Sequence, residues 1–285
     1  MSHIIQAFVP TGGRAKNDAN NRAREDALVE LTRGDIPEYA TLKQDLHLAL
    51  ASLCPFDFSR YELTKKAGRG HSYDFDLAFY SCDSGGELLR CVIKLEFKYG
   101  STSVEKLPQF YQKNTAWGIT PVLYHDFFYD GPYLDEIRLH CPDAPEKPDK
   151  ETYMRHIMKT TYSCHPFFQY LYDNEAIKQK DKNTVVKRSI RDFLAAYGSQ
   201  IDVAAVANTF RSTQADKQYL LYDPKSKVFL CQSCDFLGGE LTFVRVKKDN
   251  VIVLTNGAYE FQLLLRWKNH QGILNPAWQV SVKKM

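Results

Sequence analysis

The chain has 285 residues, which is long enough for one large or two ordinary globular domains. Hydrophobic residues make up 44% of the chain and charged residues 25%, which are ordinary values for a globular protein. The net charge of +3 at pH 7 neither requires nor excludes a nucleic-acid partner, because a local basic groove is enough to contact phosphates.

Membrane association and disulfide bonds are not expected. No apolar run reaches the length of a membrane span, and the first residues lack the basic-then-apolar pattern of a signal peptide. The seven cysteines are an odd number scattered through the chain, which favours reduced thiols over a disulfide framework. We therefore expect a soluble, intracellular protein.

Two helical patterns follow a polar, glycine- and asparagine-rich N-terminal loop. The first helix is expected from about Asp18, a good N-cap residue, to a stop at Gly34. Glu25 lies off the apolar stripe of this helix. A second helix is expected near Glu38–Leu53, where Pro37 pre-sets the first turn.

A β-hairpin is predicted after an alternating strand at Phe58–Lys66. Strands at Tyr73–Tyr80 and Leu88–Lys98 flank the turn sequence Asp83–Gly86. Because side chains alternate between the faces of a strand, the hairpin presents a polar face and an apolar face. The polar face carries Asp74, Asp76, Glu96 and Lys98, and the apolar face carries Leu77, Phe79, Leu95 and Phe97.

Two carboxylates and a lysine at one strand edge suit the hydrolysis of a phosphodiester. Mg²⁺ prefers oxygen ligands and is usually held by one or two carboxylates together with a phosphate. A bound metal lowers the pKa of its water and offsets charge on the phosphoryl group, and a nearby lysine can orient that water. Asp74, Asp76 and Glu96 would also crowd like charges on neighbouring strands, which is unfavourable without a cation.

Asp76 followed by Glu96-Phe97-Lys98 resembles the Asp…(Asp/Glu)-x-Lys signature of the PD-(D/E)XK nucleases, the restriction-endonuclease-like superfamily. The resemblance implies that Asp76 and Glu96 bind Mg²⁺, that Phe97 adds a backbone carbonyl, and that Lys98 serves the attacking water. It covers roughly residues 15 to 125. The matching positions also include Glu25 on the first helix and Gln109 on a helix after the signature, while Phe75 stands where the signature has proline.

This order of elements predicts an α/β fold with a mixed central sheet flanked by helices, which the resemblance implies is a restriction-endonuclease-like core, followed by a C-terminal helical and β-rich module. A helix is expected to begin near Val104, with Pro108 in its first turns. The segment Pro121–His125 is expected to be a short buried strand that closes the sheet.

The rest of the chain is expected to add aromatic-rich helices and a β-meander. The polar stretch Ala176–Lys182 is the best domain boundary, which gives a nuclease core with a helical extension over 1–175 and a C-terminal module over 176–285. The elements expected in that module are helices at Thr184–Tyr197 and Val203–Phe210 and strands at Tyr219–Tyr222, Val228–Gln232, Leu241–Val246, Val251–Leu254, Tyr259–Trp267 and Gly272–Val282.

Zinc chemistry is not indicated. Cys231 and Cys234 form a lone CxxC, and the pairs His140–Cys141 and Cys164–His165 lack a compact zinc-ligand spacing.

Three groups of residues are expected to contact DNA. A basic, glycine-bearing loop leads into the Asp76 strand, a basic run lies on the helix after the boundary, and a polar loop follows Trp267. Lys, Asn and His side chains in the polar loop are suited to contacting base edges. The residues are Lys65, Lys66, Arg69 and His71 in the first group, Lys187, Arg188 and Arg191 in the second, and Lys268, Asn269 and His270 in the third.

The sequence therefore predicts a Mg²⁺-dependent endonuclease that acts on double-stranded DNA, in the cytoplasm or wherever that DNA lies. Within the resemblance, a type II restriction enzyme fits a compact chain without motor or methyltransferase motifs, and such enzymes commonly cut as homodimers. Two alternatives stay open. One is a structure-specific repair, recombination or mobile-element nuclease of the same superfamily, and the other is a non-catalytic nucleic-acid-binding protein whose acids are structural.

Overall fold

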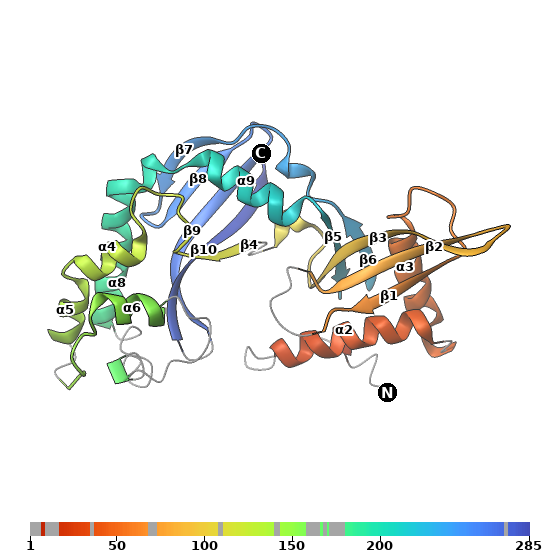
Figure 1. The fold of residues 1–285 in the computed structure, drawn as a ribbon, viewed down its shortest axis with the longest axis horizontal. Coiled ribbons are helices and arrows are strands. Elements are labelled where there is room, and N and C mark those ends of the chain that lie inside the picture. Colours follow the sequence, from red (N-terminus) through yellow and green to blue (C-terminus); the bar gives the residue numbers. More distant parts are fainter. Residues whose placement is uncertain are drawn as a thin grey trace. The chain divides into compact units, whose positions relative to one another are not determined.

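The computed structural model describes residues 7–8, 17–34, 37–67, 73–107, 111–139, 143–157, 166–167, 170, 180–270 and 273–285. These residues form a mixed α/β protein with two five-stranded sheets (Figure 1). The chain divides into two compact units. Unit 1 comprises Met1–Lys106 and Phe210–Leu237, and unit 2 comprises Leu107–Thr209 and Gly238–Met285.

Unit 1 is built on a mixed sheet with the strand order β1-β2-β3-β5-β6. The first three strands pair antiparallel, β5 runs parallel to β3, and β6 returns antiparallel to β5. The β2–β3 hairpin confirms the turn predicted around Ser84 and Gly85. The strands are β1 (Arg60–Lys65), β2 (Phe75–Asp83), β3 (Gly86–Tyr99), β5 (Lys217–Asp223) and β6 (Val228–Gln232).

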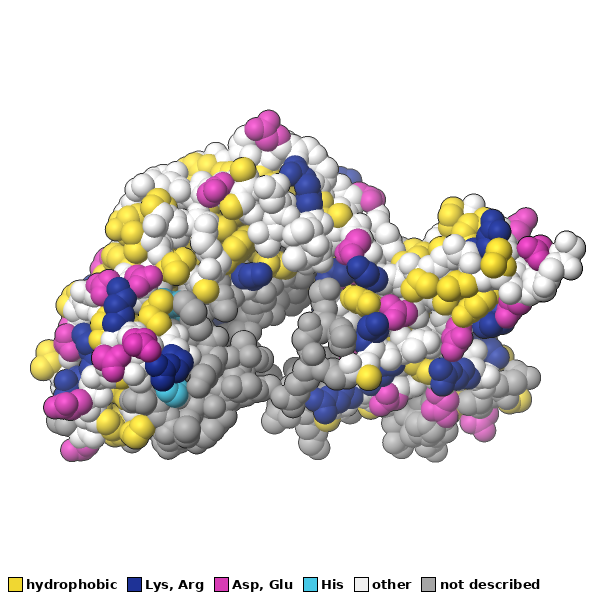
Figure 2. All heavy atoms as spheres, in the orientation of Figure 1, with side chains coloured by type: hydrophobic (Ala, Val, Ile, Leu, Met, Phe, Trp, Pro, Cys, Tyr) yellow, Lys and Arg dark blue, Asp and Glu magenta, His cyan; other side chains and the backbone are white. Residues whose placement is uncertain are grey.

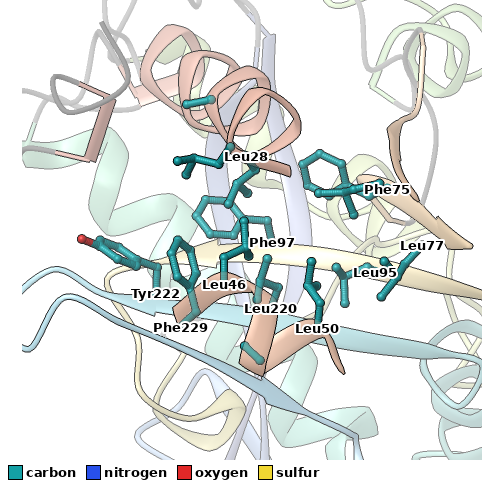
Figure 3. Packing of buried hydrophobic residues seen from close by; sticks show 14 of the residues in the cluster. Leu28, Leu46, Leu50, Phe75, Leu77, Leu95, Phe97, Leu220, Tyr222 and Phe229 are labelled. Atoms are coloured by element: carbon teal, nitrogen blue, oxygen red, sulfur yellow. The ribbon is translucent and has the colours of Figure 1, made fainter. Parts of the chain in front are cut away.

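Two helices cover the apolar face of this sheet, as their periodicity predicts. Helix α2 spans Asn17–Arg33, and α3 spans Ala40–Ala51 after a 3-10 turn, η2, at Pro37–Tyr39. Figure 3 shows Leu28 of α2 and Leu50 of α3 directed toward apolar side chains of the strands. Full burial of such a side chain contributes about 1.5–3 kcal/mol to the stability of the fold. The packing of the two helices on the sheet therefore helps to fix where the ends of β2 and β3 lie. The strand residues of the cluster include Phe75, Leu77, Phe79, Leu95, Phe97 and Leu220.

Unit 2 holds an entirely antiparallel sheet with the order β4-β10-β9-β8-β7. Its last four strands confirm the predicted meander, whose turn signals and alternation are local. The strands are β4 (Tyr111–Asn114), β7 (Thr242–Lys247), β8 (Val251–Thr255), β9 (Tyr259–His270) and β10 (Ile273–Lys284).

Helices and aromatic side chains fill the rest of unit 2. Tyr124 is fully buried; its hydroxyl accepts a hydrogen bond from Trp267 Nε1 at 2.9 Å and lies 2.7 Å from Ser189 Oγ. Phe128, Tyr133 and Tyr153 are buried as well, so aromatic side chains form much of the core of this unit. The helices are α4 (Tyr124–Asp130), α5 (Tyr133–Leu139), α6 (Lys150–Ile157) and α8 (Lys180–Tyr197), with α9 (Val203–Gln214) crossing into unit 1, and short 3-10 turns lie at η3 (Val104–Lys106), η4 (Gly198–Gln200) and η5 (Asp235–Leu237).

Two local predictions after the hairpin are wrong. The helix expected from Val104 is only the turn η3, and Tyr111–Asn114 is strand β4, because it pairs with β10. The expected strand Pro121–His125 is a bend followed by the start of α4, whose residues Tyr124 and His125 are buried. A short apolar run contains too few residues to show whether they repeat with the period of a strand or of a helix. The apolar run indicated a buried segment, but it did not determine the secondary structure of that segment.

The two units do not follow the division expected at residue 176, which itself lies outside the described residues. The predicted hairpin of β5 and β6 forms, but it belongs to unit 1 because β5 pairs with β3. The strand that completes the first sheet therefore comes from beyond residue 210, and each unit is assembled from two separate stretches of the chain.

Part of the sheet face opposite α2 and α3 is apolar and exposed. Val92 is paired with Ala78, between the buried Leu77 and Phe79, so its side chain lies on this opposite face. Val92 and Leu89 of β3 are 51% and 50% exposed. Figure 2 shows hydrophobic side chains gathered over the strands of unit 1. Among the residues that the structure describes, no helix has the length and apolar character needed to span a bilayer.

Candidate metal and phosphate site

The start of β2 lies beside the Glu96-Phe97-Lys98 segment of β3. The two strands pair antiparallel with Phe75 opposite Leu95, and the N–H of Asp74 donates to the carbonyl of Leu95 at 2.9 Å. Asp74 therefore stands opposite Glu96, one residue before the strand begins. Its carboxylate accepts the backbone N–H of Phe97 at 2.7 Å, so the acid is fixed to the middle of the tripeptide.

Glu96 is held between two lysines. One carboxylate oxygen pairs with Lys98, and the other lies 2.5 Å from the Nζ of Lys217. Lys217 reaches this position because β5 runs parallel beside β3, with Lys217 opposite Lys94 and Tyr219 opposite Glu96. Since directly paired residues share a face of the sheet, Glu96 and Lys217 lie on the same side.

A polar pocket of about 360 Å³ opens beside this cluster. Glu25 of α2 lines the pocket and pairs with Lys65 at 3.1 Å, which joins the helix to β1. Arg24 is buried, with its guanidinium 3.5 Å from the centre of the Tyr99 ring, so it anchors α2 to β3. The lining residues are Asn21, Arg24, Glu25, Asp74, Phe97, Lys98 and Tyr99.

Asp74 is partly buried beside two other carboxylates. Burial raises the pKa of this carboxyl to about 6, and the nearby carboxylates of Glu96 and Glu25 add to the rise. The hydrogen bond from Phe97 and the charge of Lys98 act in the opposite direction. A group of this kind, perturbed by burial and by specific charged neighbours and lying in a pocket, is a typical feature of functional sites.

Asp76 lies on the same face as Glu96 but has other partners. Its carboxylate pairs with Lys66 at 2.8 Å, and it stands opposite Lys94 in the β2–β3 register. The hydrogen bond to Asp76 raises the pKa of Lys66. The structure thus brings Asp74, rather than Asp76, into hydrogen-bond contact with the Glu96-Phe97-Lys98 segment.

Several residues of the predicted site lie outside the described parts of the chain. These are Gln109, Arg69 and His71. Lys268, Asn269 and His270 belong to strand β9 rather than to a loop, and their side chains are not among those described. Of the remaining cations near the site, Lys65 is engaged by Glu25 and Asp26, and Lys66 by Asp76.

A second group of predicted contact residues lines a groove in unit 2, of about 420 Å³. Lys187 and Arg191 come from α8, and Lys248 comes from the tight turn between β7 and β8, where its φ is +53°. Arg188 also lines the groove, but its guanidinium pairs with Glu136 of α5. Lys187, Arg191 and Lys248 are exposed, so the groove presents several cations to solvent.

The donor set at the first site suits a hard cation bound by few protein ligands. Among the described residues, no three His, Cys, Asp or Glu side chains form a metal-binding group. Mg²⁺ often takes only one or two carboxylates, with phosphate and water completing its shell. Asp74 and Glu96 supply two carboxylates, and burial first, then the charge of Glu96 and Glu25, makes the ionised form of Asp74 unfavourable, a cost that a cation would offset. The residues present therefore fit Mg²⁺.

Asp74 and Lys217 were not among the site residues predicted from the sequence. Asp74 shares a face with Asp76, and only its place just before β2 distinguishes the two acids. Lys217 gave no local signal, because its partner Glu96 is 121 residues away.

The chain was also compared with known proteins. No protein-family model matches it, and no curated protein matches its sequence.

Proposed function

We propose that this chain is a Mg²⁺-dependent nuclease that hydrolyses phosphodiester bonds in double-stranded DNA. The observation that carries the proposal is the contact of Asp74 with the backbone of the Glu96-Phe97-Lys98 segment, at 2.7 Å, beside a polar pocket. This is the set of groups that the PD-(D/E)XK resemblance implies, with Asp74 in place of Asp76 as the first acid.

The architecture of unit 1 supports a restriction-endonuclease-like core. Its mixed sheet carries the acids at the edge where β2 begins and β3 ends, and α2 and α3 cover the other face. Glu25 of α2 lines the same pocket, as the resemblance implies for an acid on the first helix. These positions come from three separate elements, so their meeting is not a consequence of local sequence.

The proposed roles follow from the chemistry of the side chains. Asp74, Glu96 and the carbonyl of Phe97 would hold Mg²⁺, which when bound offsets charge on the scissile phosphate and acidifies its water. Lys98 lines the pocket and is 31% exposed, so its ammonium can contact the water or the phosphate. Glu25, which is held by Lys65, completes the acidic side of the pocket.

The groove in unit 2 supports DNA as the substrate. Lys187, Arg191 and Lys248 present cations that can contact backbone phosphates without selecting bases. Site-specific cutting of both strands, as by a type II restriction enzyme, would need two active sites, which a homodimer would supply. A structure-specific nuclease of the same superfamily is the second candidate, and the same side chains would serve it.

Incubation with long duplex DNA tests the proposal. We expect cleavage with Mg²⁺, none with EDTA, and cleavage at least about 100-fold slower with the Asp74→Asn or Glu96→Gln variant. Discrete fragments indicate site-specific restriction, whereas products that depend on flaps or junctions indicate the structure-specific alternative. Intact DNA under all conditions, with Mg²⁺ or Mn²⁺, eliminates the nuclease.

A further inference from the structure

On the basis of the proposed function, we infer that Lys217 is a positioning residue of the nuclease site. It fixes one carboxylate oxygen of Glu96 and leaves the other oxygen for the metal ion. Lys217 begins strand β5, far along the chain from the tripeptide that it contacts. It belongs neither to the Glu-x-Lys segment nor to the hairpin that carries that segment.

The two oxygens of Glu96 have different partners. Lys217 Nζ lies 2.5 Å from Oε2, and Lys98 pairs with Oε1. Each carboxylate oxygen has two lone pairs, so a cation can share Glu96 with a lysine, but two ammonium groups beside the carboxylate repel a divalent cation. Metal binding is therefore favoured when one of the two lysines moves away.

Burial decides which lysine moves. The side chain of Lys217 is 4% exposed, and its ammonium lies 5.5 Å from the centre of the Tyr219 ring. If Lys217 turned away from Glu96, its ammonium would stay in the protein interior without that carboxylate, which is unfavourable. Lys98 is 31% exposed and lines the pocket, so it can turn toward solvent or substrate at little cost. Oε1 of Glu96 is then more open to the cation than Oε2, which stays paired with Lys217.

Removal of the Lys217 charge should therefore affect metal binding and turnover differently. Without the charge of Lys217 the site becomes more negative, so a divalent cation binds at least as tightly as before. The carboxylate of Glu96, however, is free to rotate, and the cation is no longer held where Lys98 and the phosphate require it. A residue with a purely structural role would instead lower cation binding and turnover together as the fold weakened.

The test uses the full chain and its Lys217→Met variant. Turnover on duplex DNA is measured at saturating Mg²⁺, Ca²⁺ binding is measured by calorimetry without DNA, and folding is checked by thermal unfolding. We expect turnover to fall at least fivefold while the Kd for Ca²⁺ stays within threefold of the wild-type value or decreases. Lys217→Arg keeps the charge and should restore turnover to within threefold of wild type. Should Lys217→Met fail to fold, Lys217→Gln, which keeps a hydrogen-bond donor, is measured against the same limits.

Lys94→Met is the matched control, because Lys94 lies on the same face of β3 but pairs with Asp216 and is 44% exposed. Its turnover should remain within twofold of wild type. A decrease of less than fivefold for Lys217→Met overturns the inference, as does a folded variant that has lost Ca²⁺ binding or an arginine variant as slow as the methionine variant. Wild-type protein that leaves DNA intact removes the proposed nuclease itself, an outcome distinct from all of these.

Discussion

Asp74 accepts the backbone N–H of Phe97 at 2.7 Å, so a carboxylate from the start of one strand is fixed to the centre of the Glu96-Phe97-Lys98 segment of the next. This hydrogen bond sets the distance between the two acids of the proposed metal site. Asp76, two residues further along the chain on β2, pairs with Lys66 instead.

The two acids should therefore differ in their importance for cleavage. Asp74→Asn keeps an oxygen that can accept the Phe97 N–H but removes the charge that would hold Mg²⁺. We expect Mg²⁺-dependent cleavage to fall at least about 100-fold, as is typical when a transition-state electrostatic contact is lost. The matched variant Asp76→Asn should stay within about tenfold of wild type. If Asp76→Asn slowed cleavage more than Asp74→Asn did, Asp76 would be the first acid of the site.

The same Asp74→Asn variant should gain stability at neutral pH. The folded-state pKa of Asp74 is about 6, above the ordinary value of an aspartate, and burial is the main cause. A raised carboxyl pKa means that the folded state binds its proton more tightly, so stability is lost as pH rises through about 6. Asp74→Asn should thus be more stable than wild type at pH 7.5 by about 1–3 kcal/mol, with the difference shrinking toward pH 4. Urea unfolding followed by circular dichroism at several pH values measures this, and a difference independent of pH would contradict burial of the Asp74 carboxylate as the cause.

The hairpin, the meander and the two N-terminal helices could be predicted because their signals are local: alternation, turn residues and helical spacing. Strand β4 could not be predicted, because only its pairing with β10 makes Tyr111–Asn114 extended. The same limit applies to the site. The Glu96-Phe97-Lys98 segment and the neighbouring hairpin strand follow from sequence, but the acid that contacts the segment is Asp74 and not the expected Asp76. Lys217 depends on the parallel pairing of β3 and β5 across more than a hundred residues.

The groove in unit 2 should contribute to DNA affinity through phosphate contacts. Lys187 and Lys248 are exposed and line the groove from two different elements, α8 and the β7–β8 turn. The Lys187→Ala/Lys248→Ala variant should bind duplex DNA about tenfold more weakly at low salt. The slope of log K against log salt should become shallower by about 1 for each lost contact, equally for unrelated sequences. Fluorescence anisotropy over a salt series measures both quantities.

The control for this experiment is Lys150→Ala, also in unit 2. Lys150 pairs with Asp126 and Asp130, at 2.9 and 2.7 Å, so these two carboxylates already neutralise its charge and it should attract a phosphate only weakly. Its affinity and salt slope should match wild type. An unchanged slope in the double variant would remove this groove from the DNA-binding surface.

Acid should destabilise unit 2 through His125. This residue is fully buried on α4, with Thr115 Oγ1 2.8 Å from Nδ1, and burial lowers its pKa to about 4. The unfolded chain takes up the proton first, so stability is lost as pH falls from about 6.5 toward 4. The loss should approach about 1 kcal/mol per pH unit within this window, and His125→Asn should remove that dependence even if it lowers stability at pH 7. The three tryptophans, Trp117, Trp267 and Trp278, all lie in unit 2, so their fluorescence reports on the unfolding of this unit.

The contribution of helix packing to the stability of unit 1 can be tested with two leucines of α3. Leu50 of α3 is fully buried in the core cluster of unit 1 (Figure 3). Leu48 on the same helix is 57% exposed. Alanine favours a helix at least as well as leucine, so neither change should weaken the helix itself. Leu50→Ala should cost about 2–5 kcal/mol through lost burial and the cavity left behind, and Leu48→Ala should stay within about 0.5 kcal/mol of wild type. Urea unfolding followed by circular dichroism compares the two variants. Equal stabilities would mean that Leu50 does not pack in the core cluster that includes residues of β2 and β3, and the position of Asp74 relative to Glu96 would then lose its support.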